Sequence, residues 1–255
     1  MNGVAAGLAR LKFRPITYTI TPFNTFRCIE QIKIDICYPK LPVIIVGTGS
    51  GLSYSQLGVT HHSMEDIAML KSLPNLQVIC PGDPTEVRLA LQAALNSNLP
   101  TYIRLGKKGE PDVHKKKPNF KIGKGIILNK GIDLSIISVG NVLALANNVK
   151  EKLKEVKIEA GLISLHTVKP LDNQLLKKIF KMNKLIVVIE EHSEIGGVGS
   201  SILEWCYKNQ FNINNLLIFS GPDIFLSSYG TQEEARKKIG LNKENILKKI
   251  MLKIK

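Results

Sequence analysis

The chain has 255 residues, a mean hydropathy of +0.04 and a formal net charge of +14. This length suits two α/β domains, and no apolar run approaches the roughly 20 residues that a membrane-spanning helix requires. The positive charge does not indicate a nucleic-acid-binding protein, because only six of the 35 basic residues are arginine and aromatic residues make up only 6% of the chain. We therefore expect no membrane and no nucleic-acid partner.

The four cysteines lie far apart and form no Cys-x-x-Cys pair, which argues against a zinc site and against a disulfide framework. The first ten residues carry no basic stretch ahead of their apolar ones, unlike a secretory signal peptide. Both features predict a cytoplasmic protein, kept in a reducing compartment.

Short apolar, β-prone runs alternate with runs of helical period along the whole chain. The strands that we expect are 16–20, 43–46, 76–80, 102–105, 134–139, 160–165, 185–189 and 216–219. Most of them are apolar at nearly every position, as a strand buried on both faces must be. Because this alternation is typical of parallel sheets with crossover helices, the sequence predicts an α/β protein with two parallel-sheet units.

Several helix starts are marked by capping residues. The run from Asp83 to Glu86 supplies an N-cap, a proline in the first turn and a glutamate three residues after the cap. The runs that begin at Ser63 and at Thr231 follow the same logic, and Asp172 is expected to cap a further helix.

The stretch from Gly106 to Asn119 is rich in Lys, Pro and Gly and lacks apolar periodicity. Such a composition is typical of a linker. We therefore expect a first domain over residues 1–106, a linker over 107–120 and a second domain over 121–255.

The segment from Gly47 to Asp66 is a long Gly/Ser/His loop between a buried strand and a helix start. In α/β enzymes such loops meet ligands at the carboxyl edge of the sheet. Its glycines do not fit the dinucleotide-binding fingerprint, and the chain carries no phosphate-loop, zinc-protease or EF-hand motif. We read the segment as an active-site loop and predict no metal site in this chain.

The loop contains adjacent histidines, His61 and His62. Neighbouring histidines in a loop point in different directions, which disfavours a shared metal. A neutral imidazole there can donate to a substrate oxygen or relay a proton near neutral pH. The structural alternative is that both histidines only flank the helix that follows.

Two further segments allow a structural and a functional interpretation. Phe23, Phe26 and Ile29 follow Thr21-Pro22 at helical spacing, so we expect a helix whose apolar face joins the core or lines a site for a flat aromatic ligand. The turn in residues 190–201 is rich in glycine and precedes a helix, where amide groups suit an anion. For both segments the structural interpretation is favoured on the residues alone.

Six motifs taken in order resemble the transketolase family of thiamine-diphosphate enzymes. They are Phe23-x-x-Phe26, Gly58-Val-Thr-His61, Leu73-Pro-Asn75, Pro81-x-Asp83-x-x-Glu86, His166-Thr-Val-Lys-Pro-Leu171 and Ile195-Gly-Gly-Val-Gly-Ser200. The resemblance covers essentially the whole chain. It implies a pyrimidine-binding fold followed by a transketolase C-terminal domain, a portion that some organisms encode as a separate subunit.

The resemblance implies a cofactor, thiamine diphosphate, whose aminopyrimidine ring lies against the segment that begins at Phe23. Phe23, Phe26 and Ile29 are the implied cofactor-binding residues, and Ile29 stands where the family often has a tyrosine. The glutamate that activates the cofactor in this family lies in a Glu-Gln-Asn-Met segment. Because this chain starts at that methionine, we expect the first strand, the first helix and the catalytic glutamate to be missing and the isolated chain to be inactive.

The resemblance also implies substrate contacts. His61 corresponds to the histidine that bonds a sugar hydroxyl or carbonyl oxygen, and it is the implied catalytic and substrate-binding residue. Lys107 falls where the family often has an arginine that grips the substrate phosphate; a lysine keeps the charge but loses the bidentate fork. Leu57 takes the place of an aspartate that contacts the substrate, which leaves the donor sugar open.

The implied reaction transfers a two-carbon ketol unit between sugar phosphates, and the carbanion chemistry belongs to the cofactor. Mg²⁺ and the cofactor's diphosphate are expected on a partner, the N-terminal diphosphate-binding subunit, in a dimer or heterotetramer. The alternatives are 1-deoxyxylulose-5-phosphate synthase, the β-subunit of a 2-oxo acid dehydrogenase, and a catalytically inert fragment or assembly subunit.

Overall fold

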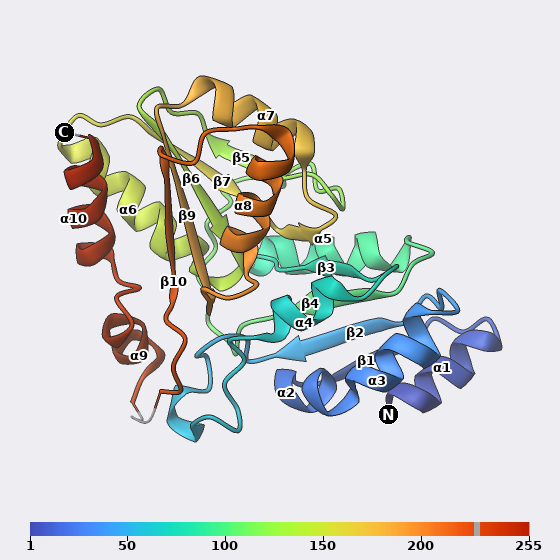
Figure 1. Cartoon of the computed structure of the whole chain (residues 1–255). Coiled ribbons are helices and arrows are strands. Elements are labelled where there is room, and N and C mark those ends of the chain that lie inside the picture. The colour runs from blue at the N-terminus through green and yellow to red at the C-terminus, as the bar shows by residue number, and fades with distance from the viewer. Residues whose placement is uncertain (227–229, 255) are drawn as a thin grey trace.

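The structure, a computed structural model, describes residues 1–226 and 230–254, and these residues form two five-stranded sheets with helices packed around them (Figure 1). In spatial order the first sheet contains β1 (Ile16–Ile20), β2 (Ile44–Thr48), β4 (Thr101–Arg104), β3 (Gln77–Ile79) and β8 (Thr167–Lys169). The second contains β10 (Leu216–Gly221), β9 (Leu185–Ser193), β6 (Leu134–Val139), β7 (Ala160–Ser164) and β5 (Ile126–Asn129). Strands pair in parallel except for the edge strands β8 and β5. The prediction of two α/β units built on parallel sheets is confirmed.

The helices cover the faces of these sheets. Around the first sheet lie α1 (Asn2–Arg10), α2 (Thr21–Asn24), α3 (Ile29–Gln31), α4 (Asp66–Ser72) and α5 (Pro84–Leu95). With the second sheet lie α6 (Leu143–Glu155), α7 (Asn173–Met182), α8 (Val198–Asn209), α9 (Gln232–Lys238) and α10 (Lys243–Ile254). None of the helices in the described part of the chain combines the length and the apolar character of a membrane-crossing segment.

The two units share a sheet edge and a core. Strand β8 follows the linker in sequence, yet it pairs with β3 of the first sheet, where Val78 lies opposite Lys169. The largest cluster of buried apolar side chains contains Ile45 and Val78 of the first sheet together with Ile186 and Trp205 of the second unit. Burial between the units therefore holds them against one another.

Three predicted helix caps are present. The side chains of Asp83, Asp172 and Thr231 each accept a hydrogen bond from the backbone N–H three residues further along the chain, and Thr231 forms a complete capping box. Each cap satisfies an N–H group that the first turn of a helix leaves unpaired. These helices therefore begin where the sequence indicates.

The cap predicted at Ser63 is wrong, because the helix α4 begins at Asp66. The Ser63 N–H donates to the carbonyl oxygen of Gly51, and the Gly51 N–H donates to that of Ser63, both at 2.9 Å. Since both backbone groups of Ser63 are used in this pairing, the residue closes the loop and does not start the helix.

The single helix expected from Phe23 is also wrong. Helix α2 ends at Asn24, and the backbone of the next residue, Thr25 (φ −122°, ψ −77°), is not helical. The Thr25 hydroxyl donates to the Thr21 carbonyl at 2.7 Å, a side-chain bond of the kind that bends helices. A 3₁₀ turn (Phe26–Cys28), the short α3 and a π-helical segment (Ile32–Cys37) follow. Phe23, Phe26 and Ile29 therefore do not share one regular helical face.

Residues 105–125, which include the expected linker, carry no helix or strand. The N–H groups of Val113 and His114 donate to Asp83 at 3.0 and 2.9 Å, and the His114 ring bonds the Glu86 carboxylate at 2.8 Å. This segment is thus attached to the N-terminus of α5.

Candidate functional site

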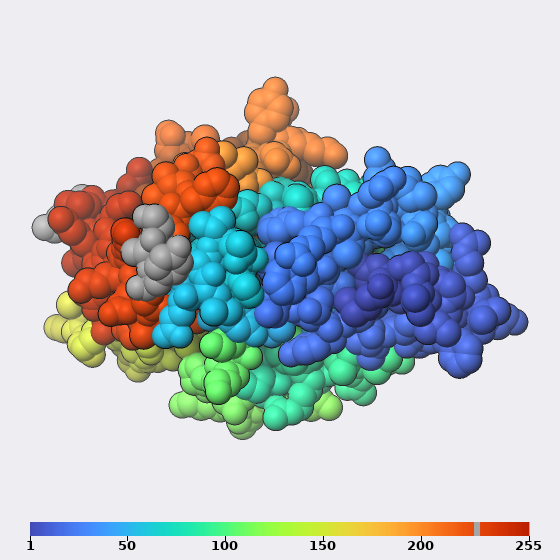
Figure 2. Space-filling model, turned by 90° about the horizontal axis from the view of Figure 1, so that it is seen from below, coloured from blue at the N-terminus to red at the C-terminus, as the bar shows by residue number. Residues whose placement is uncertain are grey.

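The loop of residues 49–65 leaves the carboxyl end of β2. The N–H groups of Gly49 and Ser50 donate to the carbonyl oxygens of Gly106 and Leu105, which follow the neighbouring strand β4, at 3.1 and 2.8 Å. Figure 2 shows this loop in cyan on the surface, between N-terminal segments in blue and C-terminal segments in orange. The loop therefore lies at the sheet edge where parallel α/β proteins bind ligands.

The shape of the loop depends on two glycines. Gly49 has φ +78°, and a Cβ atom there would lie 1.9 Å from the ring of Tyr54. Gly51 has φ +60° and takes part in the pairing with Ser63. Only glycine adopts these angles freely and leaves room for the Tyr54 ring to fold back over the loop.

Four side chains at this edge, Phe23, Tyr54, His61 and Lys107, form a contiguous group that we call the His61 cluster. The His61 ring meets Phe23 edge-on with a centroid separation of 5.3 Å and meets Tyr54 at 6.2 Å. The Lys107 ammonium lies 5.1 Å from the centre of the Tyr54 ring. Three residues proposed from the sequence are thus brought together, and Tyr54, which sequence reasoning missed, links two of them. The sequence feature that could have indicated Tyr54 is its position as an aromatic residue inside a Gly/Ser-rich loop.

The His61 cluster combines an aromatic wall, a hydrogen-bonding imidazole and a cation. His61 Nδ1 lies 2.9 Å from the Thr60 hydroxyl, and no described residue bonds its Nε2. Nε2 is therefore the ring nitrogen that can face a ligand oxygen. The guanidinium of Arg27 covers one face of the Phe23 ring at 4.2 Å. This set suits a planar ring together with an oxygen-rich, anionic molecule.

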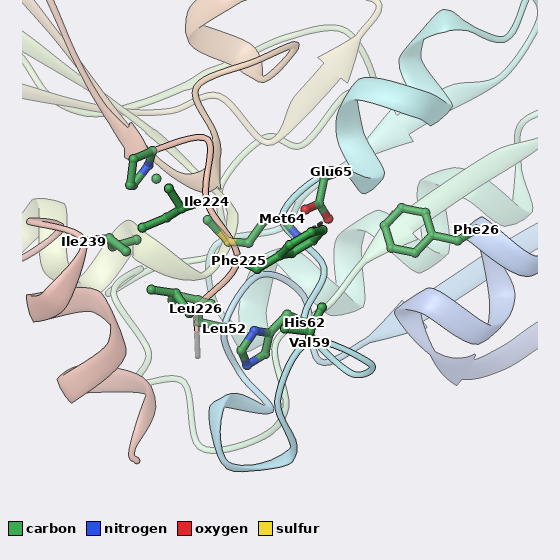
Figure 3. Close-up of a pocket in the computed structure, with 12 residues that line it drawn as sticks. Phe26, Leu52, Val59, His62, Met64, Glu65, Ile224, Phe225, Leu226 and Ile239 are labelled. Atoms are coloured by element: carbon green, nitrogen blue, oxygen red, sulfur yellow. Dashed lines mark hydrogen bonds between the residues drawn. The ribbon is translucent and has the colours of Figure 1, made fainter. Parts of the chain in front are cut away.

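Phe26 borders a cavity of about 360 Å³ between the loop and the C-terminal unit. In Figure 3, Phe26 lies on one side and Leu226 and Ile239 on the other, with Phe225, Glu65 and His62 between them. His62 is buried, and its Nε2 lies 3.2 Å from the Ser55 carbonyl, so this histidine supports the loop from within. Burial raises the pKa of the Glu65 carboxyl.

Ile29 does not line this cavity. It is partly buried and packs against the main hydrophobic core. The break at Thr25 lies between Phe23 and Phe26, so neither Phe26 nor Ile29 continues the helical face that carries Phe23. Leu57, by contrast, lies on the 3₁₀ turn Ser55–Leu57 of the loop with 51% of its surface exposed.

A second cavity, of about 310 Å³, adjoins Lys107 on the side of α5. Arg88 and Asp83 also line it, together with Thr48 at the end of β2. Arg88 donates to the Pro84 carbonyl at 3.3 Å and adds a second cation to the lining of this cavity. Sequence reasoning missed this combination because the two basic residues lie on separate elements.

A buried ion pair lies beneath the loop. The Asp66 carboxylate, fully buried at the start of α4, accepts hydrogen bonds from Arg104 Nε at 2.8 Å and from the Tyr102 hydroxyl at 2.7 Å. Burial alone raises the pKa of Asp66, but the adjacent Arg104 guanidinium reverses this and holds the pKa below its ordinary value. Arg104 Nη2 also donates to the Ser63 carbonyl at 2.9 Å, so the pair anchors the C-terminal end of the loop. The sequence feature that could have indicated this pair is Arg104, a charged residue within an apolar strand.

The glycine-rich turn after β9 has a structural role. The Glu190 carboxylate accepts the N–H groups of Val198 and Gly199 at 2.7 and 2.8 Å, so a side chain of the protein occupies the anion position at the start of α8. Nearby, His192 is buried, its Nε2 accepts the Ala68 N–H at 3.3 Å, and burial lowers its pKa. Among the described residues, no three His, Cys, Asp or Glu side chains gather closely enough to hold a metal ion.

Two family models match the chain. The transketolase pyrimidine-binding domain matches residues 1–110, and the transketolase C-terminal domain matches residues 123–246. The 1-deoxy-D-xylulose-5-phosphate synthase of Clostridium tetani is 34% identical over 97% of this chain, which spans 40% of that protein. A solved structure described as a split-gene transketolase, inactive β4 tetramer, superimposes with a TM-score of 0.89 at 32% identity, over 99% of this chain and 80% of that one.

An apulose-4-phosphate transketolase subunit of Phocaeicola vulgatus is 32% identical to this chain, and the alignment covers 96% of this chain and 78% of that protein. The match runs through both units and is therefore not confined to one shared domain. With two adjoining domain models matched and a relative this similar over most of its length, the chain belongs to the transketolase family.

Proposed function

We propose that this chain is the pyrimidine-binding subunit of a two-subunit transketolase that transfers two-carbon ketol units between sugar phosphates. The observation that carries the proposal is the His61 cluster, which places an aromatic wall, an imidazole and a cation at the carboxyl edge of the first sheet. The similarity to a split-gene transketolase and to a protein named as a transketolase subunit supports the division into two chains.

The described residues fit the aminopyrimidine part of thiamine diphosphate. Phe23 and Phe26 supply flat apolar surfaces, and Phe26 borders an open cavity of suitable size. When bound, thiamine diphosphate supplies the carbanion chemistry that breaks and forms the carbon–carbon bond. In this proposal Phe23 and Phe26 contact the ring, while Ile29 packs behind them and supports the segment from the core side.

The remaining roles fall to the loop and the residues beside it. His61 Nε2 donates a hydrogen bond to the substrate's carbonyl or hydroxyl oxygen and stabilises the charge that develops there. Lys107 pairs with the substrate phosphate, and Arg88 lies close enough to the same cavity to assist it. Leu57 offers no polar atom to the sugar, so the preferred donor differs from that of enzymes with an aspartate at this place.

We propose that a diphosphate-binding partner holds Mg²⁺ and the cofactor's diphosphate, and that the two subunits assemble into a dimer or heterotetramer. The isolated chain is then inactive, because half of the cofactor site lies on the partner. We also place the protein in the cytoplasm. The cysteines Cys28, Cys37, Cys80 and Cys206 are unpaired, which a reducing compartment permits.

Coexpression with a diphosphate-binding transketolase subunit tests the proposal, using the chain preceded by the glutamate-containing segment that the resemblance implies. The expected result is a stable complex that transfers a ketol unit from a ketose phosphate to an aldose phosphate only when thiamine diphosphate and Mg²⁺ are present. Failure to form a complex with any such subunit, or a complex that is inactive with all ketose phosphates, contradicts it.

The similarity to a 1-deoxy-D-xylulose-5-phosphate synthase supports a second candidate function. The same complex is therefore assayed with pyruvate and glyceraldehyde 3-phosphate. Release of CO₂ from pyruvate with no transfer from ketose phosphates would favour the synthase or, with a lipoyl acceptor, a 2-oxo acid dehydrogenase. A complex that forms and stays inactive with every donor would favour an assembly subunit.

A further inference from the structure

A carboxylate of the second unit reaches the base of the loop that carries His61. Glu191 lies on β9 and is fully buried, and its Oε1 accepts the backbone N–H of Leu52 at 2.7 Å. A Cβ atom at Gly51 would lie 2.3 Å from the same oxygen. The loop backbone therefore rests directly against this carboxylate, and any residue larger than glycine at position 51 would displace it.

Three residues of the second unit hold Glu191 from the other side. Arg236 forms an ion pair with it, Gln232 Nε2 donates to its two oxygens at 2.9 and 3.1 Å, and Asn141 Nδ2 lies 3.4 Å from Oε1. Burial acts to raise the pKa of Glu191, but the Arg236 guanidinium and the Leu52 N–H hold the pKa below its ordinary value. The carboxylate is thus ionised and fixed in one orientation.

The second unit forms further hydrogen bonds with the loop. Ser53 Oγ accepts bonds from Asn141 and Gln232 at 3.3 and 3.2 Å, and the N–H of Ser193, two residues after Glu191, donates to the Met64 carbonyl at 2.7 Å. In addition, Arg104 Nη2 donates to the Glu191 carbonyl at 3.0 Å while bonding the loop at Ser63. Both ends of the loop are therefore anchored to β9, and Tyr54 and His61 lie between those ends.

We propose that Glu191 is a positioning residue of this site: its carboxylate, oriented by Arg236 and Gln232, fixes the loop that presents Tyr54 and His61. This inference rests on the proposed function, in which His61 faces the substrate. Glu191 touches no reacting atom and acts through the loop backbone. Because small displacements of a catalytic group cost large factors in rate, the C-terminal unit contributes to catalysis without contacting the substrate.

The chain offers a matched control in the preceding residue. Glu190 lies on the same strand, is equally buried and accepts two backbone N–H groups, but these belong to α8 and not to the loop. Glu190→Gln and Glu191→Gln each remove one buried charge from β9. A general loss of stability affects both variants, whereas a loosened loop is expected only in Glu191→Gln.

Amide hydrogen exchange of the full chain, without cofactor or partner, measures the loop directly. Glu191→Gln is expected to speed exchange of peptides covering residues 49–65 by roughly tenfold, since a charge-assisted bond is weakened there. Glu190→Gln is expected to speed exchange only at the start of α8. Gln232→Met, a milder change at a half-buried position, should speed loop exchange about threefold and serves if Glu191→Gln does not fold.

In the assembled enzyme, Glu191→Gln is expected to lower kcat by roughly tenfold or more while leaving cofactor affinity unchanged, and Glu190→Gln to retain kcat at temperatures where both are folded. Unchanged loop exchange in Glu191→Gln, equal loosening in both variants, or a loosened loop with full kcat would overturn the proposal. If Glu191→Gln loosens the loop but the wild-type complex shows no ketol transfer, the proposed function is refuted. The anchoring of the loop by Glu191 is still supported in that case.

Discussion

Replacing Asp66 by asparagine should destabilise the protein strongly. Asp66 and Arg104 are buried, their ion pair spans 2.8 Å, and Arg104 also bonds backbone carbonyls of Ser63 and Glu191. An asparagine leaves the guanidinium buried without a counter-charge, which costs about 3–5 kcal/mol in comparable buried pairs. For a chain of this size that corresponds to a fall in Tm of roughly 6–20 °C.

Thermal unfolding followed by circular dichroism at neutral pH measures this fall. Tyr102→Phe is the control, because it removes only the hydroxyl bond to Asp66 and should cost about 1.5–3 kcal/mol. Since the folded-state pKa of Asp66 lies below the ordinary 3.8, the stabilisation is complete above that value and is lost as the pH falls through the folded-state pKa. The wild type and Asp66→Asn should therefore converge in acid. A Tm for Asp66→Asn within about 3 °C of the wild type, or a loss smaller than that of Tyr102→Phe, would refute the reasoning.

Three further changes test the site and the segment after it. His61→Asn should lower kcat/KM for ketol transfer roughly 100-fold with little change in Tm, and an unaltered rate would remove His61 from the mechanism. Lys107→Met should raise KM for phosphorylated donors at least about tenfold and leave unphosphorylated donors unaffected, with Lys108→Met as the neighbouring control. Burial acts to lower the pKa of His114, but its hydrogen bond to the Glu86 carboxylate at 2.8 Å raises this pKa overall. The pair therefore stabilises the folded protein in acid, and this contribution is lost as the pH rises through the folded-state pKa of His114. The Tm advantage of the wild type over His114→Gln should shrink as the pH rises above the ordinary histidine pKa of 6.5, and a constant difference would exclude this pair as its source.

Two strands, β1 and β6, have the predicted bounds. Strand β6 is buried at every position in the middle of its sheet, as its apolar run predicts, whereas β1 lies at the edge of its sheet and leaves Ile16 and Tyr18 exposed. The edge strands β5 and β8 were missed: β5 is half exposed and β8 has three residues. Their positions depend on neighbouring strands, which local sequence does not describe.

Strand β9 extends beyond its predicted C-terminal end. The apolar run ends at Ile189, but β9 continues to Ser193. Glu190, Glu191 and His192 are buried within it because each has partners from other elements. A run of polar residues usually signals a strand end, and only the tertiary contacts make these positions compatible with burial.

The site was predictable where it follows local sequence and unpredictable where it depends on distant contacts. His61 of the loop and Lys107 after β4 could be proposed from the family resemblance, and in the structure Tyr54 contacts both of them. The separation of Phe23 from Phe26 and Ile29 follows from the break at Thr25, whose hydroxyl bonds the Thr21 carbonyl. This side-chain hydrogen bond competes with backbone hydrogen bonds of similar strength. The spacing of the apolar residues alone therefore does not predict whether the helix continues past Thr25.

The loop has too little apolar surface to be held by burial alone. Leu52 is fully buried, but it packs against Leu226 and Ala235 of the second unit, whereas Leu57 and Val59 remain exposed by 51% and 43%. Hydrogen bonds therefore hold much of the loop, and those at Leu52 and Met64 come from β9 of the second unit. The pyrimidine-binding unit alone does not supply all the bonds that hold this loop. This dependence gives a physical reason for the two units to pack closely and to be encoded together on one chain.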